Sequence, residues 1–497
     1  MPNKIWAFAK PYIKAVLPLG LRRRPRAMLA ALNGVLPANI WSKWAMPRPF
    51  SEVELLSLAR AVSASGPHRV WSTLAHEKVR KTAENIKMGF YGNMANNHYC
   101  AVKALRKMGC DAELVLEDAI LDTYLMNRPF WQDLDVEAPA VEDAYAFEKD
   151  WPQPACVRRT QYDYELAERF EAPAAHIRVR NIYKEHFGQD IAPDSAVLLA
   201  RHMGYWPYIK TFRRYDICFF SSAAIPLAVF CPIPFIIIPT GGDINLMPFW
   251  ENLQGFLTKA AYIRADGIFS HDCYADALRR MALTHKTTAI PIINAYSPPL
   301  ENGERIREIR SSWAADRDTL CILGVSRQNW EWKGNDVLLR AFAKFGYPKA
   351  KLILMHWGQD LEKTKETIAK LGLTAKIIWE PVSSRPRLFQ KMIAADVVCD
   401  QFVMGGFGTS IVESLLAGTP VISRDPSNGH PPGQSPPPIL PADDEEAILQ
   451  HLRALTDFSV REELGRRCRE WALRERYSDE LVRDFVQHTV TIAGRHI

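Results

Sequence analysis

The sequence predicts an α/β protein with two parallel sheets, each covered by helices on both faces. Three observations support this fold class: the length of 497 residues, a repeated alternation of β-rich runs with helical segments, and a turn-rich break that divides this alternation into two series. A chain of this length is expected to form two or three domains. Strands that alternate with helices favour parallel sheets, because parallel neighbours need a crossover between them.

Each of the two series predicts one sheet. The first series comprises strands at Ile86–Tyr91, Glu113–Leu116, Asp216–Phe220, Phe235–Ile238, Gly267–Phe269 and Thr288–Ile292. The second comprises strands at Leu320–Val325, Lys351–Met355, Lys376–Trp379, Val397–Asp400 and Pro420–Ser423. The break between them is Asn294–Asn302, which is rich in turn-forming residues.

We therefore divide the chain into four parts. Residues 1–84 are a basic N-terminal extension, 85–300 the first domain and 301–477 the second. Residues 478–497 are a C-terminal helix that could cross back to the N-terminal domain. The stretch from about 122 to 194 is rich in Trp, Pro and acidic residues, which favours an insertion in the first domain.

The run Ile217–Gly242 has no charged residue and is longer than a membrane-spanning helix requires. Its four prolines, Pro226, Pro232, Pro234 and Pro239, interrupt any helix of that length. We expect two buried strands joined by a short connector instead.

Composition limits the classes of function. The chain is 47% hydrophobic and 24% charged, as in globular proteins with a large core, and its net charge of +6 does not indicate nucleic acid as a partner. Its nine cysteines are odd in number and widely spaced, which indicates neither a disulfide framework nor a zinc site. Reduced thiols and a cytoplasmic location are expected.

Positive charge is concentrated at the N-terminus, where residues 1–51 contain nine basic residues and no acidic one. Aromatic residues such as Trp6 and Tyr12 lie among them. This mixture is typical of segments that contact an anionic membrane surface, so residues 1–48 could hold the protein at the inner face of a membrane. A helix packed on the first domain explains the pattern equally well.

A glycine-rich loop follows the expected strand Val397–Asp400 and precedes a helix. Glycines let a ligand approach the backbone, and the free amides of a helix start attract anions such as a diphosphate. Glu413, on the first turns of that helix, could accept hydrogen bonds from sugar or ribose hydroxyls. The alternative is an ordinary strand–loop–helix turn with a surface glutamate. The candidate substrate-binding residues of the loop are Gly405, Gly406, Phe407, Gly408, Thr409 and Ser410.

Arg327 and Lys333 occupy a second loop between a strand and a helix. A guanidinium fork and an ammonium both suit phosphate, although the pair could also be solvated surface cations. Both loops follow the carboxyl ends of strands, where open α/β sheets bind ligands.

The order of these pieces resembles the retaining glycosyltransferase family 4, which has the GT-B fold. The resemblance extends over about a hundred residues. Its motifs are Gly324-Val-Ser-Arg327, Trp332-Lys333-Gly334, Ala394-Ala-Asp-Val-Val398, Gly406-Phe-Gly408 and Leu416-Ala-Gly-Thr-Pro-Val-Ile422. It implies two Rossmann-like domains facing a central cleft, a nucleotide-sugar donor, a glycan or lipid-linked acceptor, and transfer with retention. The resemblance implies neither a metal nor a cofactor.

The resemblance also implies roles for three residues, which are the candidate catalytic residues. Arg327 and Lys333 are expected to hold the donor diphosphate, and Glu413 the ribose. The first glutamate of the family's Glu-x7-Glu signature falls at Gly405, so the usual carboxylate contact to the donor sugar is missing. The loop backbone could take its place, or the donor could differ.

In the first domain the resemblance points to a loop and a turn. Gly92 and Asn93 are candidates for contact with the donor or acceptor, although a turn with a helix-capping asparagine explains them equally well. Asp243 belongs to a turn that resembles the family's Gly-Ser-Asp turn. Many members carry a histidine after the strand Asp216–Phe220, whereas Ser221 and Ser222 stand here.

Other kinds of site find less support. Asp133-Leu-Asp135 could suggest a metal site, but no strand is expected before it, and we interpret it as solvated acid. A dinucleotide-binding site needs Gly-x-Gly-x-x-Gly after a strand, which neither domain has. The remaining alternative is a non-catalytic GT-B relative that binds a nucleotide-sugar or acts as a scaffold.

Overall fold

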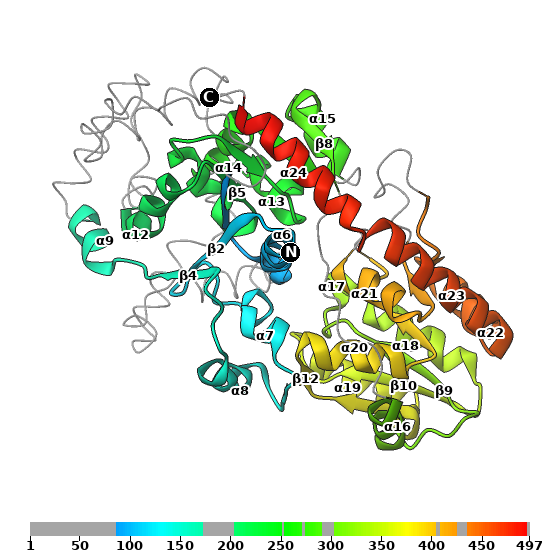
Figure 1. The fold of residues 1–497 in the computed structure, drawn as a ribbon. Helices are drawn as coiled ribbons and strands as arrows, with labels where there is room; N and C mark the ends of the chain where they lie inside the picture. The colour runs from blue at the N-terminus through cyan, green and yellow to red at the C-terminus, as the bar shows by residue number, and fades with distance from the viewer. Residues whose placement is uncertain are drawn as a thin grey trace, which may run out of the picture.

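Two α/β domains and a long C-terminal helix make up the part of the chain that the structure describes (Figure 1). This computed structural model describes residues 86–171, 203–250, 253–270, 274–290, 303–403, 408–424 and 435–494. The expected basic extension of residues 1–84, including the arm of residues 1–48, lies outside the described residues.

The N-terminal domain contains a seven-stranded sheet with the order β4-β2-β1-β5-β6-β7-β8, and all its neighbouring strands are parallel. Its strands are β1 (Lys87–Tyr91), β2 (Asp111–Glu117), β4 (Val157–Thr160), β5 (Ile217–Phe220), β6 (Phe235–Ile237), β7 (Gly267–Ser270) and β8 (Thr287–Ala289). The order reverses between β1 and β5, and ligands of open α/β sheets bind at such a switch point.

The C-terminal domain contains a six-stranded parallel sheet with the order β11-β10-β9-β13-β14-β15. Its strands are β9 (Leu320–Gly324), β10 (Ala350–Met355), β11 (Ile377–Glu380), β13 (Val397–Cys399), β14 (Val421–Ser423) and β15 (Leu440–Pro441). If the strands of each sheet are renumbered from 1 in chain order, both sheets begin with the order 3-2-1-4-5-6. This is the Rossmann order. The predicted fold class of two Rossmann-like α/β domains is confirmed.

Helices connect the strands in both domains. The longer helices of the N-terminal domain are α6 (Asn97–Lys107), α9 (Tyr164–Glu171), α14 (Leu253–Arg264) and α15 (Ala275–Arg280). Its other helical segments are η2 (Met94–Asn96), η3 (Leu125–Asn127), α7 (Pro129–Asp133), α8 (Val141–Ala144), η4 (Tyr145–Asp150), η5 (Met203–Tyr205), α12 (Trp206–Ile209), η6 (Lys210–Arg214), η7 (Ser222–Phe230), α13 (Gly242–Asn245), η8 (Met247–Phe249) and η10 (Thr284–Lys286).

The remaining helices belong to the C-terminal domain and the end of the chain. They are α16 (Gly303–Ser312), α17 (Trp330–Lys333), α18 (Asn335–Phe345), α19 (Leu361–Lys370), η11 (Thr374–Lys376), α20 (Arg385–Ala394), α21 (Thr409–Ala417), α22 (Glu445–Ala454), α23 (Phe458–Glu475) and α24 (Asp479–Gly494).

All eleven expected strands have a counterpart in the structure, but the edge strand β4 was not predicted. It lies within the stretch 122–194 that the composition marks as an insertion, so this stretch also contributes to the sheet. β4 contains two arginines and only its first residue is buried. An edge strand that is half exposed lacks the apolar run by which buried strands are recognised.

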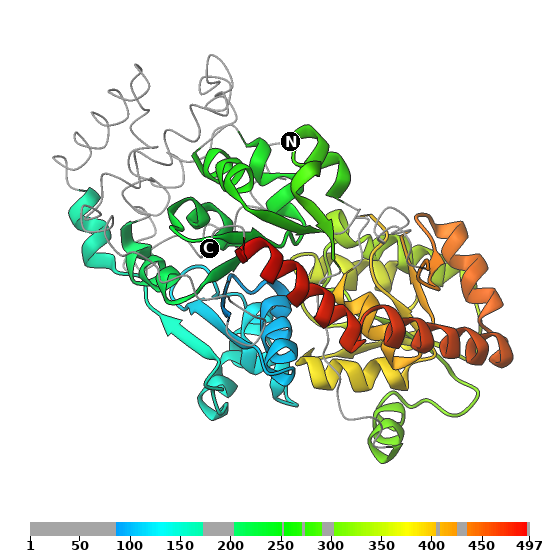
Figure 2. The same cartoon turned by 45° about the horizontal axis from the view of Figure 1, so that its top comes forward.

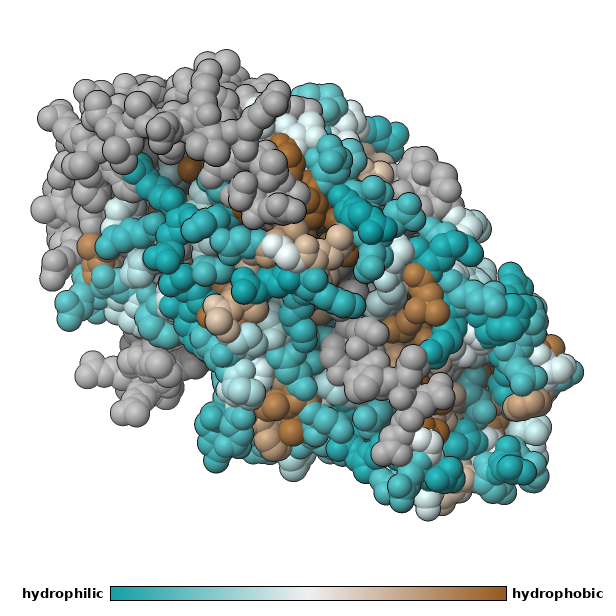
Figure 3. All heavy atoms as spheres, in the orientation of Figure 1, coloured by the Kyte–Doolittle hydropathy of each residue, from teal (hydrophilic) through white to brown (hydrophobic). Residues whose placement is uncertain are grey.

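The uncharged run Ile217–Gly242 forms β5, the 3-10 helix η7 and β6, as expected. Among the described residues, no helix has both the length and the apolar character needed to cross a membrane. Hydrophilic residues predominate on the face seen in Figure 3, and apolar residues form small separate patches there. The eight described cysteines are all free and buried.

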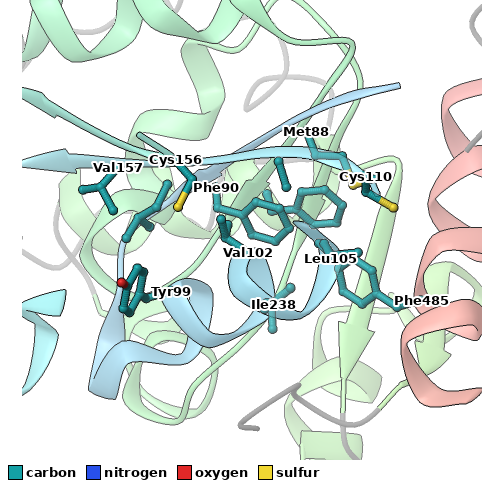
Figure 4. Packing of buried hydrophobic residues seen from close by; sticks show 14 of the residues in the cluster. Met88, Phe90, Tyr99, Val102, Leu105, Cys110, Cys156, Val157, Ile238 and Phe485 are labelled. Carbon is teal, nitrogen blue, oxygen red and sulfur yellow. The ribbon is translucent and has the colours of Figure 1, made fainter. Parts of the chain in front are cut away.

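The C-terminal helix α24 leaves the C-terminal domain and packs against the N-terminal sheet (Figure 2). Its Phe485 lies 5.2 Å from the ring of Phe219 and 5.1 Å from that of Phe269, measured between ring centroids. Figure 4 shows Phe485 reaching the cluster of Met88, Phe90 and Val102. The chain therefore crosses between the domains through the junction of α23 and α24.

A second connection joins the two domains on the side of α7 and α20. The short strands β3 (Glu137–Ala138) and β12 (Val382–Ser383) pair antiparallel, one from each domain. Next to them, the Ser384 amide donates to the Val136 carbonyl and the Val136 amide to the Ser384 hydroxyl, both at 3.0 Å. We call this pair of strands the interdomain ribbon.

Candidate functional site

The predicted donor residues meet at the carboxyl ends of β9 and β13. Arg327 follows β9 and is half-buried, and its Nη1 donates to the hydroxyl of Tyr124 at 3.2 Å. Tyr124 belongs to the N-terminal domain, just before η3. The guanidinium that is expected to hold the diphosphate therefore contacts the opposite domain directly.

Lys333 ends α17 and points to the residues that follow β13. Its Nζ donates to Oε1 of Gln401 at 2.8 Å and lies 3.8 Å from Oδ1 of Asp400. α17 is a single turn whose start is capped by the Asn329 side chain, which accepts from the Trp332 amide at 2.9 Å. The cap and the contact to Gln401 fix the ammonium at the edge of the sheet.

The glycine-rich loop is only partly described. Gly405, Gly406 and Phe407 lie outside the described residues. Gly408 is the N-cap of α21, so the free amides of this helix face the same edge as Arg327 and Lys333.

The first residues of α21 lie next to the N-terminal domain. Thr409 Oγ1 is 3.4 Å from Oδ1 of Asn97, at the start of α6. Ser410 is half-buried, and its carbonyl accepts from the Ser414 hydroxyl at 2.7 Å. The start of α21 thus meets the opposite domain at the start of α6.

Glu413 is almost completely buried, with an exposed fraction of 2%. Its Oε1 lies 2.7 Å from Nη2 of Arg385, in an ion pair that is not aligned as a hydrogen bond. Burial raises the pKa of Glu413 to about 7, although the charge of Arg385 opposes this shift. The carboxylate is engaged by Arg385, so a ribose would have to share or displace that contact.

The loop after β1 is held rigidly by its own residues. Gly92 has a φ of +75°, and a Cβ on it would lie 2.2 Å from the Ser221 carbonyl oxygen. The Asn93 side chain donates to Asn96 Oδ1 at 2.7 Å and to the Asn127 carbonyl at 2.6 Å, and accepts from the Tyr99 amide at 2.9 Å. The side chain of Asn93 therefore organises this loop from inside.

Asp243 is also buried and acts within its own turn. Its carboxylate accepts from the amides of Ser222, Thr240 and Gly241, at 2.9, 2.9 and 2.8 Å. Burial raises its pKa, and the hydrogen bonds from Thr240 and Ser222 oppose this. The turn is thereby fixed to the start of η7, near the switch point between β1 and β5.

A histidine does lie at this switch point, but it comes from α6. Nδ1 of His98 is 3.4 Å from Oγ of Ser221, directly after β5. Burial lowers the pKa of His98 to about 3, so the imidazole is neutral near pH 7. The sequence after the strand Asp216–Phe220 contains no histidine, and His98 could not be predicted there because its approach depends on the packing of α6 against the sheet.

Tyr124, Arg385, Asp400 and Gln401 were also missed as site residues. Asp400 and Gln401 could have been found, because they lie at the end of the predicted strand Val397–Asp400, which precedes the glycine-rich loop. Tyr124 and Arg385 reach the site from other elements, and no local pattern marks them.

The interpretation of Asp133 as a solvated acid is wrong. Asp133 accepts from the Tyr99 hydroxyl at 2.5 Å, from Lys103 Nζ at 2.7 Å and from Trp151 Nε1 at 2.9 Å. Together with neighbouring prolines these residues line a depression of about 450 Å³. Asp135 pairs with Arg387 of the other domain at 2.9 Å. Within the described ranges, no three His, Cys, Asp or Glu side chains are grouped as metal ligands.

Comparison with known proteins agrees with this architecture. Residues 305–432 match the family described as Glycosyl transferases group 1, and this range includes both predicted donor loops. No curated protein matches the sequence.

Several solved structures have a similar fold. HepE of Anabaena, in complex with UDP-glucose, is 14% identical, with 82% of this chain and 99% of that chain covered at a TM-score of 0.54. Sucrose-phosphate synthase from Thermosynechococcus elongatus is also 14% identical, with 82% of this chain and 100% of that chain covered at a TM-score of 0.54. A mutant of S. aureus TarM, in complex with Fondaparinux, alpha-GlcNAc-glycerol and UDP, is 10% identical, with 82% of this chain and 99% of that chain covered at a TM-score of 0.54.

At these identities the likeness establishes the fold, and the expected GT-B architecture is confirmed. The fold and the family match together support a glycosyltransferase of GT-B fold.

Proposed function

We propose that this protein transfers a sugar from a nucleotide-sugar donor to an acceptor, with retention of configuration. One observation carries the proposal. Arg327, Lys333 and the start of α21 converge at the carboxyl edge of the C-terminal sheet, within the segment that matches Glycosyl transferases group 1. Related folds with UDP or UDP-glucose bound agree with a nucleotide-sugar donor.

In the proposed reaction, the protein stabilises the departing nucleoside diphosphate. Arg327 and Lys333 bring two positive charges, and α21 brings free amides, to the place where negative charge grows as the glycosidic bond breaks. The departing phosphate oxygen can take the proton of the acceptor hydroxyl. A neutral His98 with a low pKa is a weak base, which also favours the phosphate in this role.

Binding and turnover test the proposal together. Nucleotide-sugars such as UDP-glucose and GDP-mannose are expected to raise the melting temperature of the folded protein, because a ligand bound only to the folded state stabilises it. Arg327→Ala and Lys333→Ala are expected to abolish both this shift and donor hydrolysis. If both variants hydrolyse donors as the wild type does, the proposed site is wrong. NMR of the product reports the anomeric configuration.

We propose that the reaction needs no metal, since the two cations can neutralise the diphosphate without one. Turnover is then expected to be unchanged by EDTA. A loss of turnover in EDTA that Mg²⁺ or Mn²⁺ restores contradicts this part of the proposal.

A non-catalytic relative is the second candidate, and Gly405 is the observation that favours it. The sequence has no carboxylate where the family's sugar contact is expected. Binding of nucleotides without hydrolysis or transfer, against a panel of glycan and lipid-linked acceptors, favours this candidate.

We propose a lipid-linked or cell-surface glycan precursor as the acceptor, with the arm of residues 1–48 at the inner face of the membrane. The basic and aromatic composition of that arm supports the proposal. Deletion of residues 1–48 is expected to reduce recovery with anionic vesicles while the protein stays folded. Unchanged recovery contradicts it.

A further inference from the structure

Arg327 is a half-buried cation that has one hydrogen-bond partner in the described part of the chain. Its Nη1 donates to the Tyr124 hydroxyl at 3.2 Å, and no described carboxylate forms an ion pair with it. A guanidinium has five N–H donors, so most of them remain for a ligand. Because a phenol is neutral, this partner orients the guanidinium without neutralising it, and the positive charge remains available to an anion.

The loop that carries Tyr124, residues 118–124, is fixed on both sides of the tyrosine. The Thr123 carbonyl accepts from the Tyr145 hydroxyl at 2.6 Å, and the Tyr124 carbonyl accepts from the Asn127 amide at 2.8 Å. The backbone of Tyr124 is therefore held firmly by its own domain, so its hydroxyl is well placed to hold a flexible partner.

The next segment of the chain, η3, is bonded to the loop after β1. Asn93 Nδ2 donates to the Asn127 carbonyl at 2.6 Å. Asn96 Nδ2 donates to the carbonyls of Met126 and Arg128, both at 3.0 Å. These bonds tie the loop of Tyr124 to the carboxyl end of β1. Asn93, which the resemblance marks as a substrate contact, thus helps to build the support of that loop.

We propose that Tyr124 is a positioning residue of the donor site, whose hydroxyl holds Arg327 where the guanidinium meets the donor diphosphate. This inference rests on the proposed function. Ordering a long side chain during binding costs free energy, and a side chain that is ordered beforehand avoids this cost. Since Tyr124 belongs to the N-terminal domain, that domain contributes to diphosphate affinity through a residue of the other domain.

Tyr124 could instead contribute only to the packing of its loop. Tyr145 provides a matched control, because its hydroxyl also bonds this loop and makes no hydrogen bond to Arg327. Tyr145→Phe removes a hydrogen bond that holds the loop and leaves the hydroxyl of Tyr124 in place. Tyr124→Phe removes that hydroxyl and leaves the ring.

The first test measures the Kd of UDP, GDP and ADP by calorimetry, with the full-length wild type and both phenylalanine variants. Tyr124→Phe is expected to weaken the tightest of these nucleotides about threefold to tenfold, the range of one hydrogen bond. Tyr145→Phe is expected to weaken it less than about twofold, because Arg327 keeps its partner. Circular dichroism checks the fold of each variant, and Tyr124→Leu is the second variant without the hydroxyl.

A double-mutant cycle separates positioning from packing. If Tyr124 acts through Arg327, then Tyr124→Phe has no further effect on the Kd in a chain that already carries Arg327→Ala. A residue that only packs its loop lowers the affinity by the same factor in both backgrounds. Phosphorus NMR of the nucleotide at high concentration measures the weak binding expected of Arg327→Ala.

Three results overturn the proposal while the donor site stands. They are unchanged affinity in Tyr124→Phe, equal losses in Tyr124→Phe and Tyr145→Phe, and equal factors in the two backgrounds of the cycle. A wild-type protein that binds none of the three nucleotides overturns the proposed function and this inference with it, and that outcome is seen without any variant.

Discussion

At the residue scale, the buried pair of Glu413 and Arg385 makes stability depend on pH. The folded protein holds the pKa of Glu413 at about 7, above the ordinary value of 4.5. Between these values the folded state binds the proton more tightly than the unfolded state, so stability falls as pH rises. The difference in free energy of unfolding between the wild type and Glu413→Gln is expected to change by up to about 3 kcal/mol between pH 4.5 and pH 7.5, to the disadvantage of the wild type at the higher pH. Urea titrations measure it, and a constant difference between the two proteins contradicts the shift.

The loop after β1 requires glycine at position 92 because of space as well as backbone conformation. Gly92→Ala is expected to destabilise the protein by at least about 1 kcal/mol more than Gly109→Ala. Both glycines have positive φ, at +75° and +86°, but a Cβ meets the Ser221 carbonyl at position 92 and open space at position 109. Thermal unfolding of the two variants gives the comparison, and equal losses of stability show that the conformation alone matters.

Sequence reasoning at this scale found residues whose neighbours in the chain form a pattern. Arg327 and Lys333 follow a strand, and both lie at the carboxyl edge of the sheet. It could not find Tyr124 or Arg385, because their positions depend on contacts between segments that are far apart in the sequence. Nor does the sequence show that the side chain of Asn93 is already hydrogen-bonded within the loop.

At the element scale, buried strands were predictable and half-exposed ones were not. β9 and β10 consist almost entirely of buried residues and read as apolar runs. β4 and the short strands of the interdomain ribbon lack such runs, since their pairing partners and not their own composition determine them. A helix such as α24 was predictable from its period, and the sequence suggested that it could cross back to the N-terminal domain, but not that Phe485 contacts Phe219 and Phe269.

The packing of α24 gives the prediction at this scale. Phe485 is 2% exposed and lies among aromatic side chains of the N-terminal sheet. Phe485→Ala is expected to cost about 3–5 kcal/mol of unfolding free energy through lost burial and a cavity. Phe458 begins α23 with an exposed fraction of 65%, so Phe458→Ala should change stability by less than about 0.5 kcal/mol. Chemical denaturation measures the stability of the two variants. If both lose equally little stability, α24 does not pack as described.

At the scale of the whole molecule, several contacts between described residues connect the domains, and three of them stand out. They are the α23–α24 junction, the interdomain ribbon and the contact of Arg327 with Tyr124. Beside the ribbon, Nζ of Lys391 in α20 is 2.5 Å from Glu137 Oε1 of the N-terminal domain and also contacts Glu380 of its own domain. A charge cluster centred on the buried Lys391 therefore joins the two domains.

Lys391→Met is expected to uncouple them. Lys391 is 2% exposed, and its loss leaves Glu380, with 10% of its side chain exposed, without its cationic partner. Breaking such a buried pair costs about 3 kcal/mol or more within the C-terminal domain, and the same substitution removes the ion pair of Lys391 with Glu137 between the domains. Scanning calorimetry is expected to show two separated transitions where the wild type shows one, because multidomain proteins unfold together only while their interface holds. Lys370→Met is the control, since Lys370 pairs with Glu366 at 3.9 Å on the surface and such pairs contribute little. A Lys391→Met variant that unfolds in the same way as Lys370→Met contradicts the coupling.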